Sequence, residues 1–214
     1  MNIVKNFESI KKNIPFDVKI IAVSKTKSNE EILQIYDVGH RAFGENRIQE
    51  LKEKYDKLPK DIKWHMIGHL QKNKVKHIAP FVDLIHSLDS VKLASEINKQ
   101  GEKNNRVINC LIQIKISKDD TKYGVSFEEF DQFYKHINSL KYINVVGLMG
   151  MASLTNNEDV IKDEFKSISL LYNELKLVDK KIAHLSIGMS NDYKLAINEG
   201  GNMIRIGSRI FGER

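Results

Sequence analysis

Short apolar runs alternate with amphipathic segments along the chain, and this alternation limits the possible folds more than any other feature. The apolar runs are rich in β-branched residues, as buried strands are. Eight such runs occur, at 18–23, 42–43, 64–67, 84–86, 107–116, 145–149, 183–187 and 203–206. Segments with helical spacing lie between them, at 30–38, 47–57, 71–79, 91–100, 128–140, 159–178 and 191–198. The pattern predicts parallel strands joined by helical crossovers.

Eight strand–helix units fit either a closed barrel or a long open sheet. No GxGxxG fingerprint follows the first strand, which disfavours a dinucleotide-binding open sheet. The 214 residues are at the short end of the range for (β/α)₈ barrels. We therefore expect an α/β fold, a single (β/α)₈ TIM barrel. No linker-like stretch interrupts residues 1–214, which predicts one domain, and apolar residues at helical spacing in 3–14 predict an extra N-terminal helix.

The compartment is inferred from what the sequence lacks. No apolar run approaches the ~20 residues of a membrane-spanning helix, and charged residues interrupt the N-terminal apolar positions. The single cysteine, Cys110, cannot form an internal disulfide and lies in an Ile-rich strand, where we expect it to be core. A cytoplasmic protein without a membrane partner is the simplest expectation.

The charge balance favours small anionic partners over nucleic acid. The formal net charge is +6, which attracts anions through electrostatic steering. Only six of the 34 basic residues are Arg, and the lysines are spread along the chain without a basic tract or a nucleic-acid-binding motif. A nucleic-acid-binding module remains a rival reading, which would require binding that falls steeply with salt. The seven histidines show no metal-ligand spacing such as HExxH, so we expect no metal.

The first strand ends in a lysine. Side chains alternate along a strand, so Ile21, Val23 and Lys25 share one face, and Lys25 is expected at the mouth of the barrel. A lysine partly removed from water becomes a usable amine nucleophile. The simpler interpretation is a surface lysine, and the two readings are evenly balanced on position alone.

Gly/Ser turns follow the last two strands. Gly188-Met189-Ser190 and Gly207-Ser208 each open a helix, at the strands where barrels of this type commonly bind phosphate. Taken singly, Ser190 is more simply a plain N-cap and Gly207 a plain turn, but their joint placement after the last two strands favours an anion site. Arg205, in the last strand, is either a planar donor for a ligand or a structural ion-pair partner.

Several motifs in a fixed order resemble one known family. They are AVSKTK (22–27), FGEN (43–46), WHMIGHLQKNK (64–74), LIQIKIS (111–117), GLM (147–149), LSIGMSNDY (185–193) and RIGSRIFG (205–212). From about residue 18 onward the chain resembles the pyridoxal-phosphate homeostasis protein family, whose barrel is similar to the N-terminal domain of alanine racemase. The resemblance implies a protein that binds pyridoxal 5′-phosphate (PLP) and buffers or delivers it.

The resemblance also implies roles for individual residues. It implies that PLP forms a Schiff base with Lys25, that Arg205 faces the pyridine nitrogen, and that the remaining groups bind phosphate (Ser190, Gly207, Ser208) or line the pocket (Asn46, Met149). A guanidinium disfavours protonation of the pyridine nitrogen, so the ring would be a poor electron sink. The family often carries Asn where this chain has Lys115. The lysines Lys27, Lys115 and Lys122 therefore remain alternative PLP carriers.

Two expectations about activity follow from the resemblance. Racemases of this fold take a second base from a C-terminal domain, and this sequence ends at Arg214, so we expect no racemase turnover. The alternative is a PLP-dependent amino-acid racemase or decarboxylase that takes its base from Tyr123, Tyr193 or His69. The expected partners are PLP and PLP-dependent apoenzymes, and we expect a monomer or weak dimer because no long apolar stripe is evident.

Overall fold

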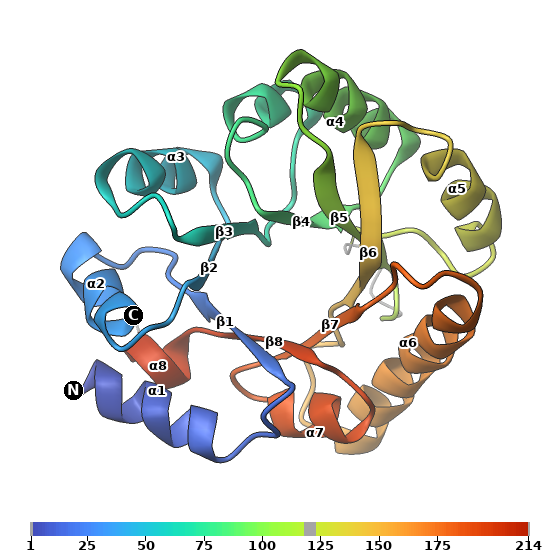
Figure 1. Ribbon diagram of the computed structural model, residues 1–214. Coiled ribbons are helices and arrows are strands. Elements are labelled where there is room, and N and C mark those ends of the chain that lie inside the picture. The colour runs from blue at the N-terminus through green and yellow to red at the C-terminus, as the bar shows by residue number, and fades with distance from the viewer. Residues whose placement is uncertain (1, 118–122, 214) are drawn as a thin grey trace.

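The strands of this protein close into a parallel barrel surrounded by helices (Figure 1). A computed structural model describes residues 2–117 and 123–213. In these residues the strands follow one another around the barrel in chain order: β1 (Lys19–Val23), β2 (Ala42–Glu45), β3 (Lys63–Met66), β4 (Leu84–Leu88), β5 (Ile108–Ile114), β6 (Ile143–Gly150), β7 (His184–Met189) and β8 (Met203–Ile206). The predicted (β/α)₈ fold is confirmed.

The helices form the outer ring, as Figure 1 shows. They are α1 (Ile3–Lys12), α2 (Asn29–Asp37), α3 (Ile48–Lys57), α4 (Val91–Lys103), α5 (Phe130–Ile137), α6 (Glu158–Val178), α7 (Tyr193–Asn198) and α8 (Ser208–Phe211), with the 3₁₀ helix η1 (Lys72–His77). The extra N-terminal helix is confirmed as α1, which precedes β1 and packs beside α8. Its N-cap is Asn2, whose side chain accepts a hydrogen bond from the Lys5 N–H.

Closure of the barrel places the first strand beside the last. β1 pairs in parallel with β8, with Ile21 opposite Arg205 and Ala22 opposite Ile206. The segments that leave these two strands therefore emerge side by side at the carboxyl end of the barrel. Lys25 and the Gly207-Ser208 turn, far apart in the sequence, become neighbours for this reason.

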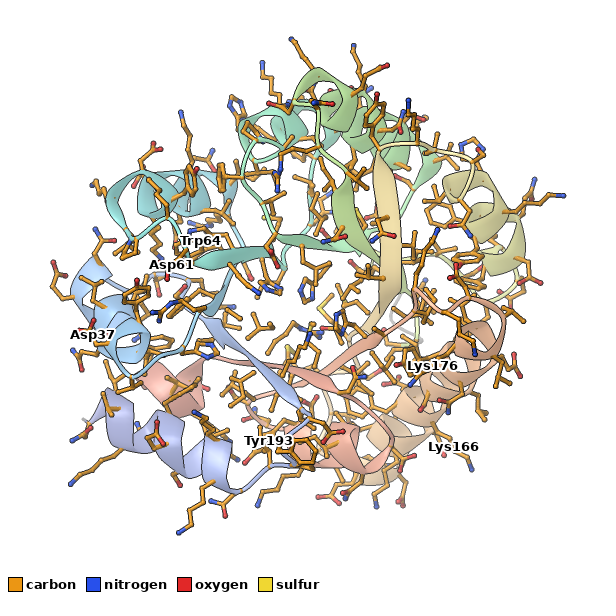
Figure 2. All side chains as sticks on the ribbon, in the orientation of Figure 1. Asp37, Asp61, Trp64, Lys166, Lys176 and Tyr193 are labelled. Carbon is orange, nitrogen blue, oxygen red and sulfur yellow. The ribbon has the colours of Figure 1, made fainter. Side chains whose placement is uncertain are left out.

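Side chains alternate between two apolar layers on either side of the strands. One layer packs the strands against the helices and includes Trp64, which is fully buried between β3 and α3 (Figure 2). The other lies inside the barrel and consists of Ile21, Leu84, Leu111, Met149 and Met203. This inner layer supports the mouth of the barrel from below.

The tertiary structure decides the type or the start of three helices. The segment 71–79 forms the 3₁₀ helix η1, with an i→i+3 bond from the Lys74 N–H to the Gln71 carbonyl. The N-cap of α3 is Arg47 without a side-chain cap, because Asn46 follows β2 and faces a cavity instead. α7 begins after Asp192, so Ser190 is not its N-cap.

In the described part of the chain, no helix is both long enough and apolar enough to cross a membrane.

Buried and half-buried histidines make the stability of the fold sensitive to acid. Burial lowers the pKa of His65 to about 3 and the pKa of His40 and His184 to about 4, and it holds the pKa of His86 well below its usual value. Between pH 6.5 and about 4 the unfolded chain therefore binds more protons than the folded chain. Stability should fall as the pH drops through this window, by up to about 1.4 kcal/mol per pH unit for each histidine.

Urea unfolding at a series of pH values measures this slope. In His40→Phe the new ring would sit between Phe7 and Phe43. This variant should show a smaller change in the free energy of unfolding per pH unit, because one proton fewer is taken up on unfolding. The exposed His136→Gln is the control and should leave the slope unchanged. A stability that stays constant between pH 6.5 and pH 4 would contradict the assignment of these histidines as neutral in the folded state.

Candidate functional site

A cavity of about 1070 Å³ opens at the carboxyl end of the barrel. Residues that end or follow β1, β2, β3, β6, β7 and β8 line it, as expected for the functional end of this fold. Six of the seven residues predicted for the site are among them: Lys25, Asn46, Ser190, Arg205, Gly207 and Ser208. Tertiary structure thus brings together groups from positions 25 to 208.

Met149 is the predicted pocket residue that does not line the cavity. It is fully buried inside the barrel, in the apolar layer that includes Ile21 and Leu111. β6 runs one residue further than the predicted strand, to Gly150, so position 149 remains within the barrel. Met151, two residues further along the same face, lines the cavity instead.

The chain makes a tight turn directly after Lys25. Val23 and Lys25 both line the cavity, as their alternation along β1 predicts. Thr26 has φ of 65°, a left-handed conformation that β-branched residues rarely adopt. Its N–H donates to Glu50 Oε2 at 2.7 Å, and its hydroxyl donates to the Lys25 carbonyl at 2.6 Å. Such a conformation persists only where the surroundings fix it, so the backbone directly after Lys25 is held in a defined turn.

A buried ion pair supports this turn from behind. Lys54 Nζ, on α3, donates to the Ser24 carbonyl at 2.7 Å and to Glu45 Oε1 at 2.8 Å. The Ser24 hydroxyl donates to the same carboxylate oxygen at 2.6 Å. Burial raises the pKa of Glu45, and the adjacent Lys54 ammonium opposes that shift. The sequence patterns did not single out Glu45, although a glutamate in an apolar strand is the signal for a buried partner.

The Gly/Ser turns after β7 and β8 are joined to each other. The Gly207 N–H donates to Ser190 Oγ at 3.2 Å, and Arg209 Nε donates to the Ser190 carbonyl. Gly188 has φ of +89°, and a Cβ there would meet the Cβ of Ala196 at 2.5 Å, so the turn requires glycine. Ser208 then opens α8, and the first turn of a helix leaves backbone N–H groups without intrahelical partners. Amide and hydroxyl donors therefore gather on one side of the cavity.

Arg205 reaches the cavity from inside the barrel. It is buried, and its Nη1 donates to the carbonyl and the hydroxyl of Ser186, each at 2.7 Å, while Nη2 donates to the Gly150 carbonyl at 2.9 Å. Burial lowers the pKa of Arg205 to about 10, which leaves the guanidinium charged at neutral pH. Within the described residues its partners are uncharged oxygens, so the structure does not support the reading of Arg205 as half of an ion pair.

The other lysines considered for the site lie in different settings. Lys27 lines the cavity, and its Nζ donates to the Phe211 carbonyl at 3.1 Å and lies 3.5 Å from the Glu31 carboxylate. Lys115 is not among the described residues that line the cavity. Lys122 lies outside the described residues.

Two of the three candidate bases lie at the cavity and the third does not. His69 and Tyr123 line the cavity with their rings stacked 3.9 Å apart. His69 Nδ1 lies 3.3 Å from the carboxylate of Asp89, which follows β4. Tyr193 does not line the cavity; it is buried at the start of α7 (Figure 2). Among the described residues, no group of three or more His, Cys, Asp or Glu side chains is placed to hold a metal ion.

Comparisons with known proteins agree with this architecture. Residues 1–214 match the family model of the alanine racemase N-terminal domain. The pyridoxal phosphate homeostasis protein of Aquifex aeolicus is 40% identical over 92% of this chain and 87% of its own length. The corresponding protein of Pasteurella multocida is 38% identical over 100% of this chain and 98% of its own length.

Solved structures show the same similarity. PipY of Synechococcus elongatus, solved without PLP, has a TM-score of 0.93 at 32% identity and covers 99% of this chain and 100% of its own. The PipY structure with PLP bound has a TM-score of 0.91 at 31% identity. Alanine racemase of Clostridium difficile shares the fold, with a TM-score of 0.86 at 17% identity over 57% of its length. With this barrel, these relatives and a match along its whole length, the chain belongs to the pyridoxal phosphate homeostasis protein family.

Proposed function

We propose that this protein binds PLP in the cavity at the barrel mouth, as a Schiff base on Lys25, and that it buffers or delivers the cofactor. The observation that carries the proposal is the meeting of three kinds of group in one cavity: the Lys25 amine, the Arg205 guanidinium and the Ser190–Gly207 donors. An amine suits an aldehyde, a guanidinium suits a pyridine nitrogen, and amide and hydroxyl donors suit a phosphate. PLP carries all three of these groups. The PLP-bound structure of PipY supports the same assignment.

The residues around the cavity favour storage of the cofactor over catalysis. PLP supplies an aldehyde that condenses reversibly with amines and a ring that can withdraw electrons when its nitrogen is protonated. Arg205 has only donors to offer, so it would leave that nitrogen unprotonated. Lys25 would retain PLP, and the constrained turn at Thr26 would keep the amine directed at the cavity. We therefore propose that turnover is absent or slow.

The direct test is to trap and locate the adduct. The purified protein should be yellow with PLP, and borohydride reduction should fix one pyridoxyl phosphate group. Mass spectrometry of the digested protein is expected to find that group on Lys25. A protein that acquires no adduct, or an adduct confined to Lys27, would overturn the proposal.

Ser190→Ala is expected to weaken the binding of PLP about 10- to 100-fold. A hydrogen bond to a charged group is worth about 1.5–3 kcal/mol, and this hydroxyl lies beside the Gly207 amide in the proposed phosphate cradle. The dissociation constants of PLP and of pyridoxal, which lacks the phosphate, should be measured by absorption titration. The substitution should affect PLP alone. An equal loss for both compounds would remove Ser190 from the phosphate site.

A second candidate function rests on His69. Its imidazole lines the cavity, and its Nδ1 lies 3.3 Å from the Asp89 carboxylate, a negative charge that favours a histidine acting as a base. The protein would then be a slow PLP-dependent racemase or decarboxylase. Incubation of the PLP-loaded protein with a panel of amino acids, followed by chiral analysis, distinguishes the two functions. Sustained turnover that His69→Asn abolishes would favour the enzyme.

We further propose that the protein is cytoplasmic, that residues 1–214 fold as one domain, and that PLP-dependent apoenzymes receive its cofactor. The net charge of +6 suits a phosphorylated ligand and is not tied to any nucleic-acid motif.

Mixing the loaded protein with an apoenzyme should restore that enzyme's activity without free PLP. Size-exclusion chromatography tests the proposed monomer or weak dimer, and a single cooperative unfolding transition would support one domain.

A further inference from the structure

A chain of polar side chains crosses the barrel interior beneath the cavity. His65 on β3, His86 on β4 and Ser186 on β7 are all buried, each no more than 4% exposed. His65 Nδ1 lies 2.9 Å from His86 Nε2, and His86 Nδ1 lies 3.1 Å from Ser186 Oγ. Ser186 Oγ in turn accepts a hydrogen bond from Arg205 Nη1 at 2.7 Å. We call His65, His86 and Ser186 the histidine column.

The arginine end fixes the direction of the first hydrogen bond. A guanidinium only donates, so the Ser186 hydroxyl accepts from Arg205, and its own proton is available for His86 Nδ1. In that arrangement His86 carries its proton on Nε2 and donates to His65 Nδ1. His65 is then protonated on Nε2, which lies 3.8 Å from the Asp83 carboxylate. Both histidines are held as neutral rings of defined tautomer.

Polar side chains in the barrel interior lower the stability that an apolar filling would provide. The interior of a (β/α)₈ barrel is usually packed with branched apolar side chains, and burial of polar groups costs free energy even when they are hydrogen-bonded. Here the apolar inner layer of Ile21, Leu111 and Met149 is interrupted on the side that holds Arg205. The position of these polar groups beside Arg205 thus indicates that they serve to hold its guanidinium.

We propose that His65, His86 and Ser186 are positioning residues that hold Arg205 as a fixed donor toward the pyridine nitrogen of PLP and so keep that nitrogen unprotonated. This inference rests on the proposed function. Two other anchors, the Ser186 and Gly150 carbonyls, limit where the guanidinium can lie. The Ser186 hydroxyl is the third anchor, and a hydroxyl proton donated to His86 Nδ1 points away from Arg205 and leaves the oxygen to accept from the guanidinium.

Three substitutions test the column. Ser186→Ala removes the hydroxyl, His86→Phe removes the acceptor for its proton, and His86→Gln retains one acceptor and one donor. Ser169→Ala is the matched control, because it removes a similarly buried hydroxyl on α6 outside the column. The measurements are the dissociation constant of PLP, the absorption spectrum, and the NMR shift of an isotope-labelled pyridine nitrogen in the bound cofactor.

Ser186→Ala and His86→Phe are expected to raise the dissociation constant about tenfold, the effect that outer hydrogen-bond partners commonly have. Both should move the nitrogen shift toward the value of a protonated pyridine, whereas His86→Gln and Ser169→Ala should stay near the parent protein. In an Arg205→Gln background, His86→Phe should have no further effect on the nitrogen shift, because the column acts through Arg205. If His86→Phe does not fold, the smaller change Ser186→Ala carries the same test.

The result that overturns the inference differs from the result that overturns the proposed function. Unchanged nitrogen shifts and affinities in Ser186→Ala, with the adduct still on Lys25, would reject the column and retain PLP binding. An effect of His86→Phe that persists in the Arg205→Gln background would also reject it. Failure of the parent protein to bind PLP would instead reject the proposed function.

Discussion

Lys25→Ala protein is expected to lose the borohydride-fixed adduct completely, because the substitution removes the amine that would bond to the PLP aldehyde. Residual PLP should still bind without a covalent bond, through Arg205 and the Ser190–Gly207 turn. The protein should therefore turn pale on gel filtration while the parent stays yellow. Absorption spectra before and after borohydride, followed by mass spectrometry, measure the loss.

Lys27→Ala is the matched control for this prediction. Lys27 also lines the cavity, but its ammonium contacts the Phe211 carbonyl and the Glu31 carboxylate. The control should retain the full adduct at Lys25. A Lys25→Ala protein that remains fully yellow and still yields a reduced adduct would show that another lysine carries PLP.

Lys54→Met is expected to destabilise the protein by about 3–5 kcal/mol. The substitution leaves the fully buried carboxylate of Glu45 without its cation, and removal of one member of a buried ion pair has a cost of this size. It also removes the ammonium that holds the Ser24 carbonyl, directly before Lys25. Urea unfolding measures the change, and a parallel loss of PLP affinity would link the buried pair to the Lys25 turn.

Two further variants isolate the buried charge as the cause. The double variant Lys54→Met, Glu45→Met should recover much of the lost stability, because it leaves no unpaired charge. Lys162→Met is the matched surface control, since Lys162 pairs with Glu158 through exposed side chains on α6 and such pairs contribute at most about 1 kcal/mol. If Lys54→Met lowers the free energy of unfolding no more than Lys162→Met does, the buried pair contributes no more to stability than a surface pair.

Local patterns were sufficient to predict the elements of this fold. The apolar runs located all eight strands of the barrel to within a few residues, because a buried parallel strand must be apolar along its length. Ser28 caps α2 and Ser90 caps α4 close to the predicted helix starts, since capping depends on neighbouring residues only. Met149 was expected at the pocket, but the fold keeps it inside the barrel, because β6 continues to Gly150.

Composition and spacing determined that this chain alternates strands and helices, and strand-end positions singled out Lys25, Ser190, Arg205 and Gly207. Only the tertiary structure decided what these groups meet. The Glu45–Lys54 pair joins β2 to α3, and the histidine column joins β3, β4 and β7 to β8. Periodicity reports whether a side chain is buried, but a hydrogen bond across a closed barrel depends on register and rotamer, which arise only when all eight strands are in place.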